Sequence, residues 1–516
     1  MKKEILANSF VIIGVIAYNF LFWGEKLGLN VLIFSILLLG GLFTLYPESR
    51  QSNMAKITAI GTLITAGLIV YNNSMYVKVM HFISITAMIG FVQRHALRFF
   101  WYGLSVFVLN FIELPKRFGQ EIGRITQNIQ GFHRVVRFGK LAVFPSIVVV
   151  IFWIIYSIAN PNFADLSNRF FLFLNDFLFS WIYHISLQRF LFIFSGFVLM
   201  GLVFYKHSGD LLEKLESTKR FKLIRKLAKS RKAVLAKAEI ERTEQTTNQN
   251  YESKRQNPIR LKNEYRTALM LFWALNALLF VVNLTDIPYM FEDFSNKPNW
   301  ELRQYVHQGT YLLIVAIFFA MALILFYFRK NLNFYPRNAW LKTAAYAWIF
   351  QNVLLAVSVG IRNYNYVTFD GLAYKRIGVF IFLIFVAIGL FTVFLKVRDK
   401  KTGYYLFFTN SWATYLVLVA FAFVNWDVWI TEYNLKHFPK DEKLSFLIRD
   451  VSDKNLWVLE ENGIDEYSIE DGYLANKIKE KRIDFMNEQS EYSWASWNYA
   501  DYLNDKRLTA DGRRSN

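Results

Sequence analysis

Residues 377–395 read IGVFIFLIFVAIGLFTVFL, a run of nineteen residues without a charged side chain. An α-helix of about 20 apolar residues is long enough to cross the hydrocarbon core of a bilayer. The rest of the chain has a similar character, since 54% of its 516 residues are hydrophobic and 18% are aromatic. The sequence therefore predicts an all-α, polytopic transmembrane helical bundle.

We expect eleven runs of this kind to cross the membrane, or up to thirteen if two ambiguous segments also do. The eleven are residues 6–23, 31–47, 57–72, 77–93, 141–158, 190–205, 267–286, 309–328, 339–359, 377–395 and 406–426. No small-residue cleavage site follows the first run, which predicts a retained signal anchor. The ambiguous segments are 99–113, which is short for a span, and 165–184, which contains Arg169, Asp176 and His184. We expect both to be interfacial or re-entrant.

The distribution of positive charge predicts the orientation. The chain holds 59 Lys and Arg against 40 Asp and Glu, and positive residues collect in the cytoplasmic loops of membrane proteins. An N-terminus inside the cell also places the most basic segment, residues 206–266, inside. The C-terminal tail then lies outside. The same rule accounts for the net charge of +19, so we expect no nucleic-acid partner.

Four parts are predicted along the chain. Residues 1–205 form an N-terminal membrane block, 206–265 a basic cytoplasmic segment with a linker, 266–432 a second membrane block, and 433–516 a polar extracytoplasmic tail. Within 206–240, apolar residues at helical spacing among lysines indicate either a helix on anionic lipid or a solvated connector, and both remain open. The tail has few aliphatic residues, so we expect it to pack on the outer face of the bundle. Its late aromatic residues are Trp494, Trp497, Tyr499 and Tyr502.

Common catalytic and metal-binding patterns are absent from the sequence. There is no cysteine, which excludes disulfides, thiolate metal sites and thiol nucleophiles. No phosphate-binding loop, dinucleotide fingerprint, HExxH, GxSxG or EF-hand loop is found either. With seven histidines and no suitable spacing, the sequence indicates no metal site and no cofactor. An enzymatic role is left open and disfavoured.

Polar residues at the outward ends of the second membrane block form the candidate site. Ionisable groups in or beside spans cost free energy and so suggest a function. The candidates for ligand binding are Asp286, His307, Arg362, Asn363, Tyr374, Lys375, Arg376 and Asp427. One interpretation is a set of ion pairs that pin loops to the bundle, with Asp286, Asp370, Asp427 or Glu432 as the acids. The other is a pocket for an anionic group such as a phosphate, a lipid headgroup or a carboxylate. A role for His307 as a general base or pH-responsive group is a weaker alternative.

The order of several motifs in the second half resembles a known family. These are His307-Gln308-Gly309, Gln351-Asn352, Arg362-Asn363, Tyr374-Lys375-Arg376-Ile377-Gly378-Val379, Asn425-Trp426-Asp427, Tyr433-Asn434-Leu435 and the WASWNY segment at 494–499. Over about residues 265–500 the chain is similar to a bacterial polytopic membrane family catalogued as a domain of unknown function, the DUF4153 and DUF4173 group. The resemblance implies a helical, polytopic fold and no known reaction, and so it assigns no catalytic residue.

Three functions are compatible with these features. The first is binding or transport of an anionic or lipid-linked ligand at the outward-facing polar cluster. The second is a non-enzymatic envelope sensor, or an assembly or scaffold protein, with other envelope proteins as partners. The third is a membrane enzyme acting on lipid-linked substrates, which requires a carboxylate or histidine beside the basic cluster. In each case we expect a multi-pass protein of the bacterial inner membrane, in contact with its lipids.

Overall fold

The computed structural model describes residues 2–125, 149, 152–153, 156–157, 160–179, 186–207, 209–224, 258–290, 315 and 317–512. Across these ranges every regular element is a helix, apart from one isolated bridge between Lys222 and Lys401. This agrees with the predicted all-α class. The first helices are α1 (Lys2–Phe22), α2 (Leu29–Leu45), α3 (Asn53–Asn72), α4 (Met75–Gln93), α5 (Phe100–Ile125), α7 (Pro161–Phe179), α8 (Leu187–Phe204) and α9 (Leu211–Ser217).

The second half contains the longest helices, α11 (Pro258–Met290), α13 (Ala339–Asp370) and α14 (Tyr374–Asp399). It also contains a helix described over Ile317–Tyr327, α15 (Gly403–Phe421) and α16 (Trp426–His437). The tail forms α17 (Lys440–Arg449), α18 (Leu456–Glu461), α19 (Gly472–Glu491) and α20 (Tyr499–Gly512).

Among the described residues, seven helices are long and apolar enough to cross a membrane, namely α1, α3, α4, α8, α11, α13 and α14. The count becomes eight if α15 and α16, bent by 60° at their junction, form one broken span. Two predicted spans are shorter apolar helices, Leu29–Leu45 and Ile317–Tyr327. A further one, 141–158, lies almost wholly outside the described residues. The protein is therefore an integral, multi-pass membrane protein.

The described parts of the two ambiguous segments form helices that do not meet the length and apolarity of a span. The helix predicted from 99–113 is α5, which extends to Ile125 and contains Pro115. Its apolar residues lie on one face, as in helices at a membrane surface. Of segment 165–184, α7 accounts for the part up to Phe179, and the next residues lie outside the described ranges.

Serine residues begin three of the spanning helices. Ser52, Ser74 and Ser186 are the N-caps of α3, α4 and α8, and each side chain accepts a hydrogen bond from a backbone N–H in the first turn. Such a cap satisfies one of the free N–H groups of a helix start. The helix starts are thus specified locally, by residues just outside each apolar run.

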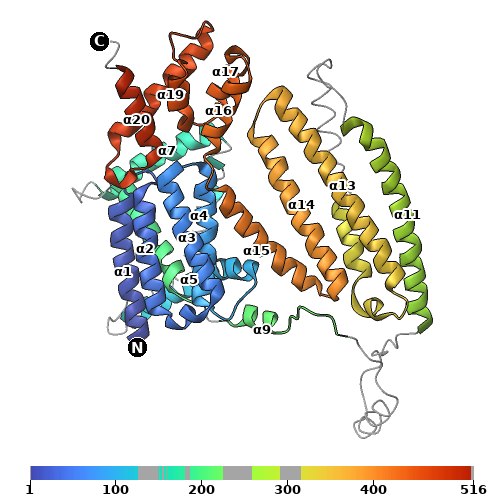
Figure 1. The fold of residues 1–516 in the computed structure, drawn as a ribbon. Coiled ribbons are helices and arrows are strands. Elements are labelled where there is room, and N and C mark those ends of the chain that lie inside the picture. The colour runs from blue at the N-terminus through green and yellow to red at the C-terminus, as the bar shows by residue number, and fades with distance from the viewer. Residues whose placement is uncertain are drawn as a thin grey trace. The chain divides into compact units, whose positions relative to one another are not determined.

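Two compact units make up the structure. Unit 1 contains residues 1–218, 416–432 and 440–516, and unit 2 contains residues 219–415 and 433–439. In unit 1, α17, α19 and α20 lie at one end of the α1–α4 bundle, opposite the N-terminus (Figure 1). Within this unit α4 and α5 approach closely, since a Cβ on Gly90 would lie 1.9 Å from the carbonyl oxygen of Gly103. Small residues allow this kind of helix packing in membranes.

Aromatic side chains organise the core of unit 2. The ring of Phe272 on α11 packs edge-on against Phe328 and Trp348, at centroid distances of 6.1 and 5.2 Å. Tyr265 stacks on Tyr335 at 4.6 Å. These contacts hold α11 and α13 side by side, as seen in Figure 1.

The start of unit 2 belongs to the segment predicted to be basic and cytoplasmic. Here the backbone N–H of Leu223 donates to the carbonyl of Lys400, and the ring of Phe221 stacks on Tyr404. Residues 219–224 therefore contact the start of α15. Residues 225–257, which include the C-terminal part of the segment 206–240 and the linker, lie outside the described residues. Contact of 206–240 with anionic lipid stays a prediction.

Amide side chains join the helices of unit 2. Asn276 on α11 donates to the carbonyl of Ala344 on α13 at 2.9 Å and accepts from Gln351 Nε2 at 2.7 Å. Between α14 and α15, the Thr392 hydroxyl donates to Asn410 Oδ1 at 3.0 Å. Interhelical hydrogen bonds of this type typically contribute about 0.6 kcal/mol each in membranes. These amides have a structural role that explains their presence inside spans.

Candidate functional site

The turn between α13 and α14 in unit 2 is the centre of the predicted polar cluster. Gly371 has φ of +83°, a backbone conformation that favours glycine, and a Cβ there would lie 2.1 Å from Asn434 Oδ1. Asn434, on the part of α16 that belongs to unit 2, accepts from the N–H of Leu372 at 2.9 Å and donates to its carbonyl at 2.8 Å. One asparagine side chain thus fixes the turn by bonding both backbone groups of a single residue.

Arg376, in the first turn of α14, is almost fully engaged within this turn. Its guanidinium donates to the carbonyls of Asp370 and Gly371 and forms an ion pair with the Asp370 carboxylate. Its planar face lies over the ring of Tyr366, 4.0 Å from the centroid. A guanidinium fork suits this combination of two carbonyls and a carboxylate. The structure therefore contains one of the ion pairs that the sequence predicted as the alternative to a ligand pocket.

Arg362 and Asn363 lie on α13, two turns before Gly371, and both are buried, with 7% and 1% of their surface exposed. Asn363 donates to the backbone carbonyl of Arg376 at 3.0 Å, which ties the start of α14 to α13. Tyr374 and Lys375, by contrast, are exposed. The turn therefore combines a buried arginine, a paired arginine and an exposed lysine within one short stretch.

Three further predicted site residues are Asp286, His307 and Asp427. Asp286 lies in α11, and its side chain is outside what the structure describes. His307 also falls outside the described residues. Asp427 belongs to unit 1, where it is 6% exposed and its carboxylate accepts from Ser452 Oγ at 2.6 Å.

A comparison with protein-family models identifies the family. The model described as Domain of unknown function (DUF4153) matches residues 57–462. The chain belongs to the DUF4153 family. The match confirms the family inferred from the motifs. It begins further towards the N-terminus than the predicted 265–500, in α3, and ends at residue 462, so the WASWNY segment at 494–499 lies outside it. No curated protein and no solved structure matches the chain.

The tail of this DUF4153 protein contains a charge network that the sequence did not reveal. Lys454, 7% exposed, forms ion pairs with Asp453 at 3.0 Å and with Asp501. Burial opposes the charge of Lys454, but the two carboxylates outweigh it and raise its pKa. Asp501 also accepts from Asn498 Nδ2 at 2.7 Å. Lys454 and Asp501 are 47 residues apart, and nothing in the local pattern signals their pairing.

The tail also contacts the loop between α1 and α2. The Glu25 carboxylate accepts from the N–H of Ser493 at 3.1 Å and from the Ser496 hydroxyl. Burial would raise the pKa of Glu25, but these serine hydrogen bonds hold it below its usual value. The N–H of Leu29 donates to the carbonyl of Trp497 at 2.9 Å. The tail therefore packs on the helical bundle within unit 1, and its place on the outer face of the membrane stays a prediction.

A buried histidine in unit 1 was missed at the level of sequence. His81 of α4 lies between Ser35 of α2 and Thr65 of α3, at 3.4 and 3.1 Å from their hydroxyls. Its position inside an otherwise apolar run was the available signal. The two hydroxyls satisfy the ring nitrogens, so the arrangement joins three helices. Within the described ranges, no three His, Asp or Glu residues come close enough to hold a metal ion.

Proposed function

We propose that the protein binds an anionic, lipid-linked ligand at the α13–α14 turn, on the outer side of a bacterial inner membrane. The observation that carries this proposal is the combination of a rigid turn with an exposed cation. Asn434 and Asp370 fix the backbone and Arg376, while Lys375 beside them is exposed. Such a turn holds the backbone of Lys375 in one position, so its exposed ammonium extends from a rigid support, which favours recognition of an anion over non-specific attraction.

A lipid-linked anion suits the turn better than a free one. An exposed ion pair contributes only about 0.2–1 kcal/mol, which gives a soluble anion little affinity. A basic residue near a membrane surface adds about 1 kcal/mol for a charge that the bilayer already concentrates there. Lys375 begins a spanning helix, at the level where headgroups of membrane lipids lie.

The residues at the α13–α14 turn are better suited to binding a ligand than to catalysing a reaction. A hydrolytic or transfer step needs a carboxylate or histidine that can accept a proton. Asp370 is the carboxylate at this turn, and it is ion-paired with Arg376. The geometry therefore supports ligand binding rather than a membrane enzyme.

The test uses purified full-length protein in nanodiscs of phosphatidylcholine with increasing phosphatidylglycerol. We expect Lys375→Ala to weaken phosphatidylglycerol binding severalfold relative to the wild type. Lys479→Ala removes another exposed lysine, on α19, and serves as the matched control. Equal binding by the two variants would contradict the proposal, and inhibition by millimolar inorganic phosphate would indicate a free anion in place of a lipid-linked one.

We also propose a second candidate function, docking of an envelope protein on the tail. The supporting observation is that Trp494 and Trp497, anchored through Ser493 and Ser496, remain 56% and 45% exposed. Exposed tryptophans on a fixed segment are frequent anchors of protein interfaces. A photo-reactive residue at position 494 should give a discrete cross-linked product that one at position 479 does not. The absence of any product specific to position 494 would argue against docking.

A further inference from the structure

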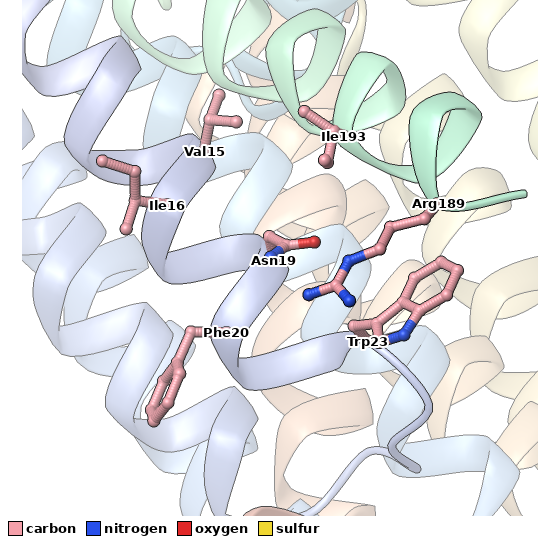
Figure 2. Close-up of a pocket in the computed structure, with 7 residues that line it drawn as sticks. All are labelled: Val15, Ile16, Asn19, Phe20, Trp23, Arg189 and Ile193. Atoms are coloured by element: carbon pink, nitrogen blue, oxygen red, sulfur yellow. The ribbon is translucent and has the colours of Figure 1, made fainter. Parts of the chain in front are cut away.

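A groove runs between α1 and α8 on unit 1, with a volume of about 420 Å³. Its walls are Val15, Ile16, Asn19, Phe20 and Trp23 from α1 and its C-terminal end, with Arg189 and Ile193 from α8. Figure 2 shows Arg189 reaching from α8 towards Asn19 and Trp23. The volume is more than ten times the ~30 Å³ share of one water molecule, so it accommodates part of a larger ligand.

The spacing of residues along the two helices explains the groove. The α1 residues recur at intervals of one, three and four positions and so share one face, as do Arg189 and Ile193 on α8. Beside the groove, α1 and α8 pack closely, because Tyr18 stacks on Phe192 at 4.6 Å and Gly196 faces the Tyr18 ring. Trp23 packs edge-on against the same Phe192 at 5.2 Å. Aromatic packing therefore fixes the walls of the groove.

One part of the groove is apolar and is open at the surface of unit 1. Val15 forms a buried floor with 5% exposure, whereas Ile16 and Phe20 are 64% and 72% exposed. These residues belong to spanning helices, so the exposed side chains face lipid. An acyl chain is the natural occupant of this part.

The opposite end of the groove is cationic. The guanidinium carbon of Arg189 lies 5.5 Å from the centroid of the Trp23 ring. Arg189 is in the first turn of α8, and Trp23 directly follows α1. Tryptophan and arginine at span ends mark the level of the lipid headgroups. A phosphate at this level would meet the exposed guanidinium.

Between these two parts lies an unsatisfied amide. Asn19 Oδ1 is buried and has no hydrogen-bond partner within the described part of the chain. Leaving such a group unpaired is unfavourable, so a ligand that bonds to it is stabilised. An amide can reverse its two ends, and Nδ2 can then donate to an ester carbonyl. Asn19 is one helical turn before Trp23, and the ester groups of a phospholipid likewise lie just below its phosphate.

We infer that this groove binds one anionic glycerophospholipid, with the phosphate at Arg189, an ester carbonyl at Asn19 and an acyl chain along Val15, Ile16 and Ile193. The site lies in unit 1 and uses none of the residues of the α13–α14 turn. It therefore goes beyond the proposed function, and neither depends on the other.

Native mass spectrometry of the full-length protein, titrated with phosphatidylglycerol in detergent, tests this inference. A charge-assisted hydrogen bond contributes about 1.5–3 kcal/mol. Arg189→Ala should therefore weaken binding of the first lipid about tenfold or more, and Arg189→Lys should recover part of it. Arg50→Ala, at an exposed arginine outside the groove, is the matched control and should leave binding unchanged.

Two further variants distinguish lipid binding in the groove from attraction of the lipid to a surface charge. Ile193→Trp fills the groove and should weaken binding although Arg189 remains. If that variant does not fold, Asn19→Ala serves the same purpose at an unpartnered side chain. Equal affinity of the wild type for phosphatidylglycerol and phosphatidylcholine would overturn the inference. So would unchanged binding by the Asn19→Ala and Arg189→Ala variants, or displacement of the lipid by inorganic phosphate.

Discussion

The guanidinium carbon of Arg376 lies 4.0 Å from the ring centroid of Tyr366, ten residues earlier and on the preceding helix. A cation over an aromatic face contributes about 0.5–2 kcal/mol, depending on its exposure. Together with the Asp370 carboxylate, the ring holds the arginine in one orientation. The positive charge at the α13–α14 turn is therefore fixed in place, and Lys375 is the adjacent cation that stays exposed.

The buried lysine of the tail should be important for stability. Lys454→Met leaves Asp453 and Asp501 without their shared cation. Breaking a buried ion pair by removing one partner typically costs about 3–5 kcal/mol. We expect a clear drop in the thermal unfolding midpoint of the purified protein. Lys477→Met, which removes a lysine from the fully exposed pair with Glu480, should leave the midpoint unchanged. Similar midpoints for the two variants would show that the network contributes little.

The docking of the tail on the loop before α2 should depend on Gly28. A Cβ at this position would lie 2.3 Å from the carbonyl oxygen of Ser496, so Gly28→Ala pushes the segment around Trp497 away. Limited proteolysis should then cleave the tail faster than in the wild type. Gly40→Ala is the control, because a Cβ there meets no atom within 4 Å. Equal cleavage rates for both variants would count against a docked tail.

Lys481 should make the stability of unit 1 depend on pH. Its ammonium donates to Asn455 Oδ1 at 2.9 Å and to the Val451 carbonyl at 3.0 Å. Burial lowers the pKa of Lys481 from 10.5 to about 8, despite the opposing charges of Asp453 and Asp427. At pH values between about 8 and 10.5, Lys481 is protonated in more of the unfolded chains than of the folded ones. The contribution of Lys481 to the free energy of unfolding therefore rises with pH over this range.

Lys481→Met isolates this contribution. The unfolding free energy of the wild type, minus that of the variant, should increase as pH is raised from about 8 towards 10.5. Denaturant unfolding followed by tryptophan fluorescence at several pH values measures the difference. A difference that stays constant or decreases with pH would rule out a buried lysine with a lowered pKa.

The predicted orientation can be tested directly, because the chain has no cysteine and single cysteines can be introduced without background. We expect a membrane-impermeant maleimide to label Lys375→Cys and Lys479→Cys in intact spheroplasts. Lys219→Cys, in the segment predicted to be cytoplasmic, should react only after permeabilisation. All three positions are exposed in the structure. Labelling of position 219 in intact spheroplasts would reverse the topology.

The spanning helices were predictable because the bilayer imposes one length and one polarity on each of them. Runs such as 377–395 specify a helix from composition alone. The lengths of α11 and α13 were not predictable in the same way, since both continue past their apolar runs.

The candidate site was predictable only in part. Clustering of Arg362, Asn363 and Arg376 follows from their places on either side of one turn. Whether Arg376 is free or paired depends on the geometry of Gly371 and Asn434, which no local pattern reveals. Long-range pairs such as Lys454 with Asp501 are invisible for the same reason, because they depend on how helices pack rather than on residue spacing.

Releasing Arg376 from its carboxylate tests the proposed function most directly. In Asp370→Asn the arginine keeps its backbone carbonyls and Tyr366, but its charge is no longer neutralised. Phosphatidylglycerol binding in nanodiscs should become severalfold tighter than in the wild type, and adding Lys375→Ala should reverse part of the gain. If binding is unchanged or weaker while the protein remains folded, the α13–α14 turn has a structural role and is not a ligand site.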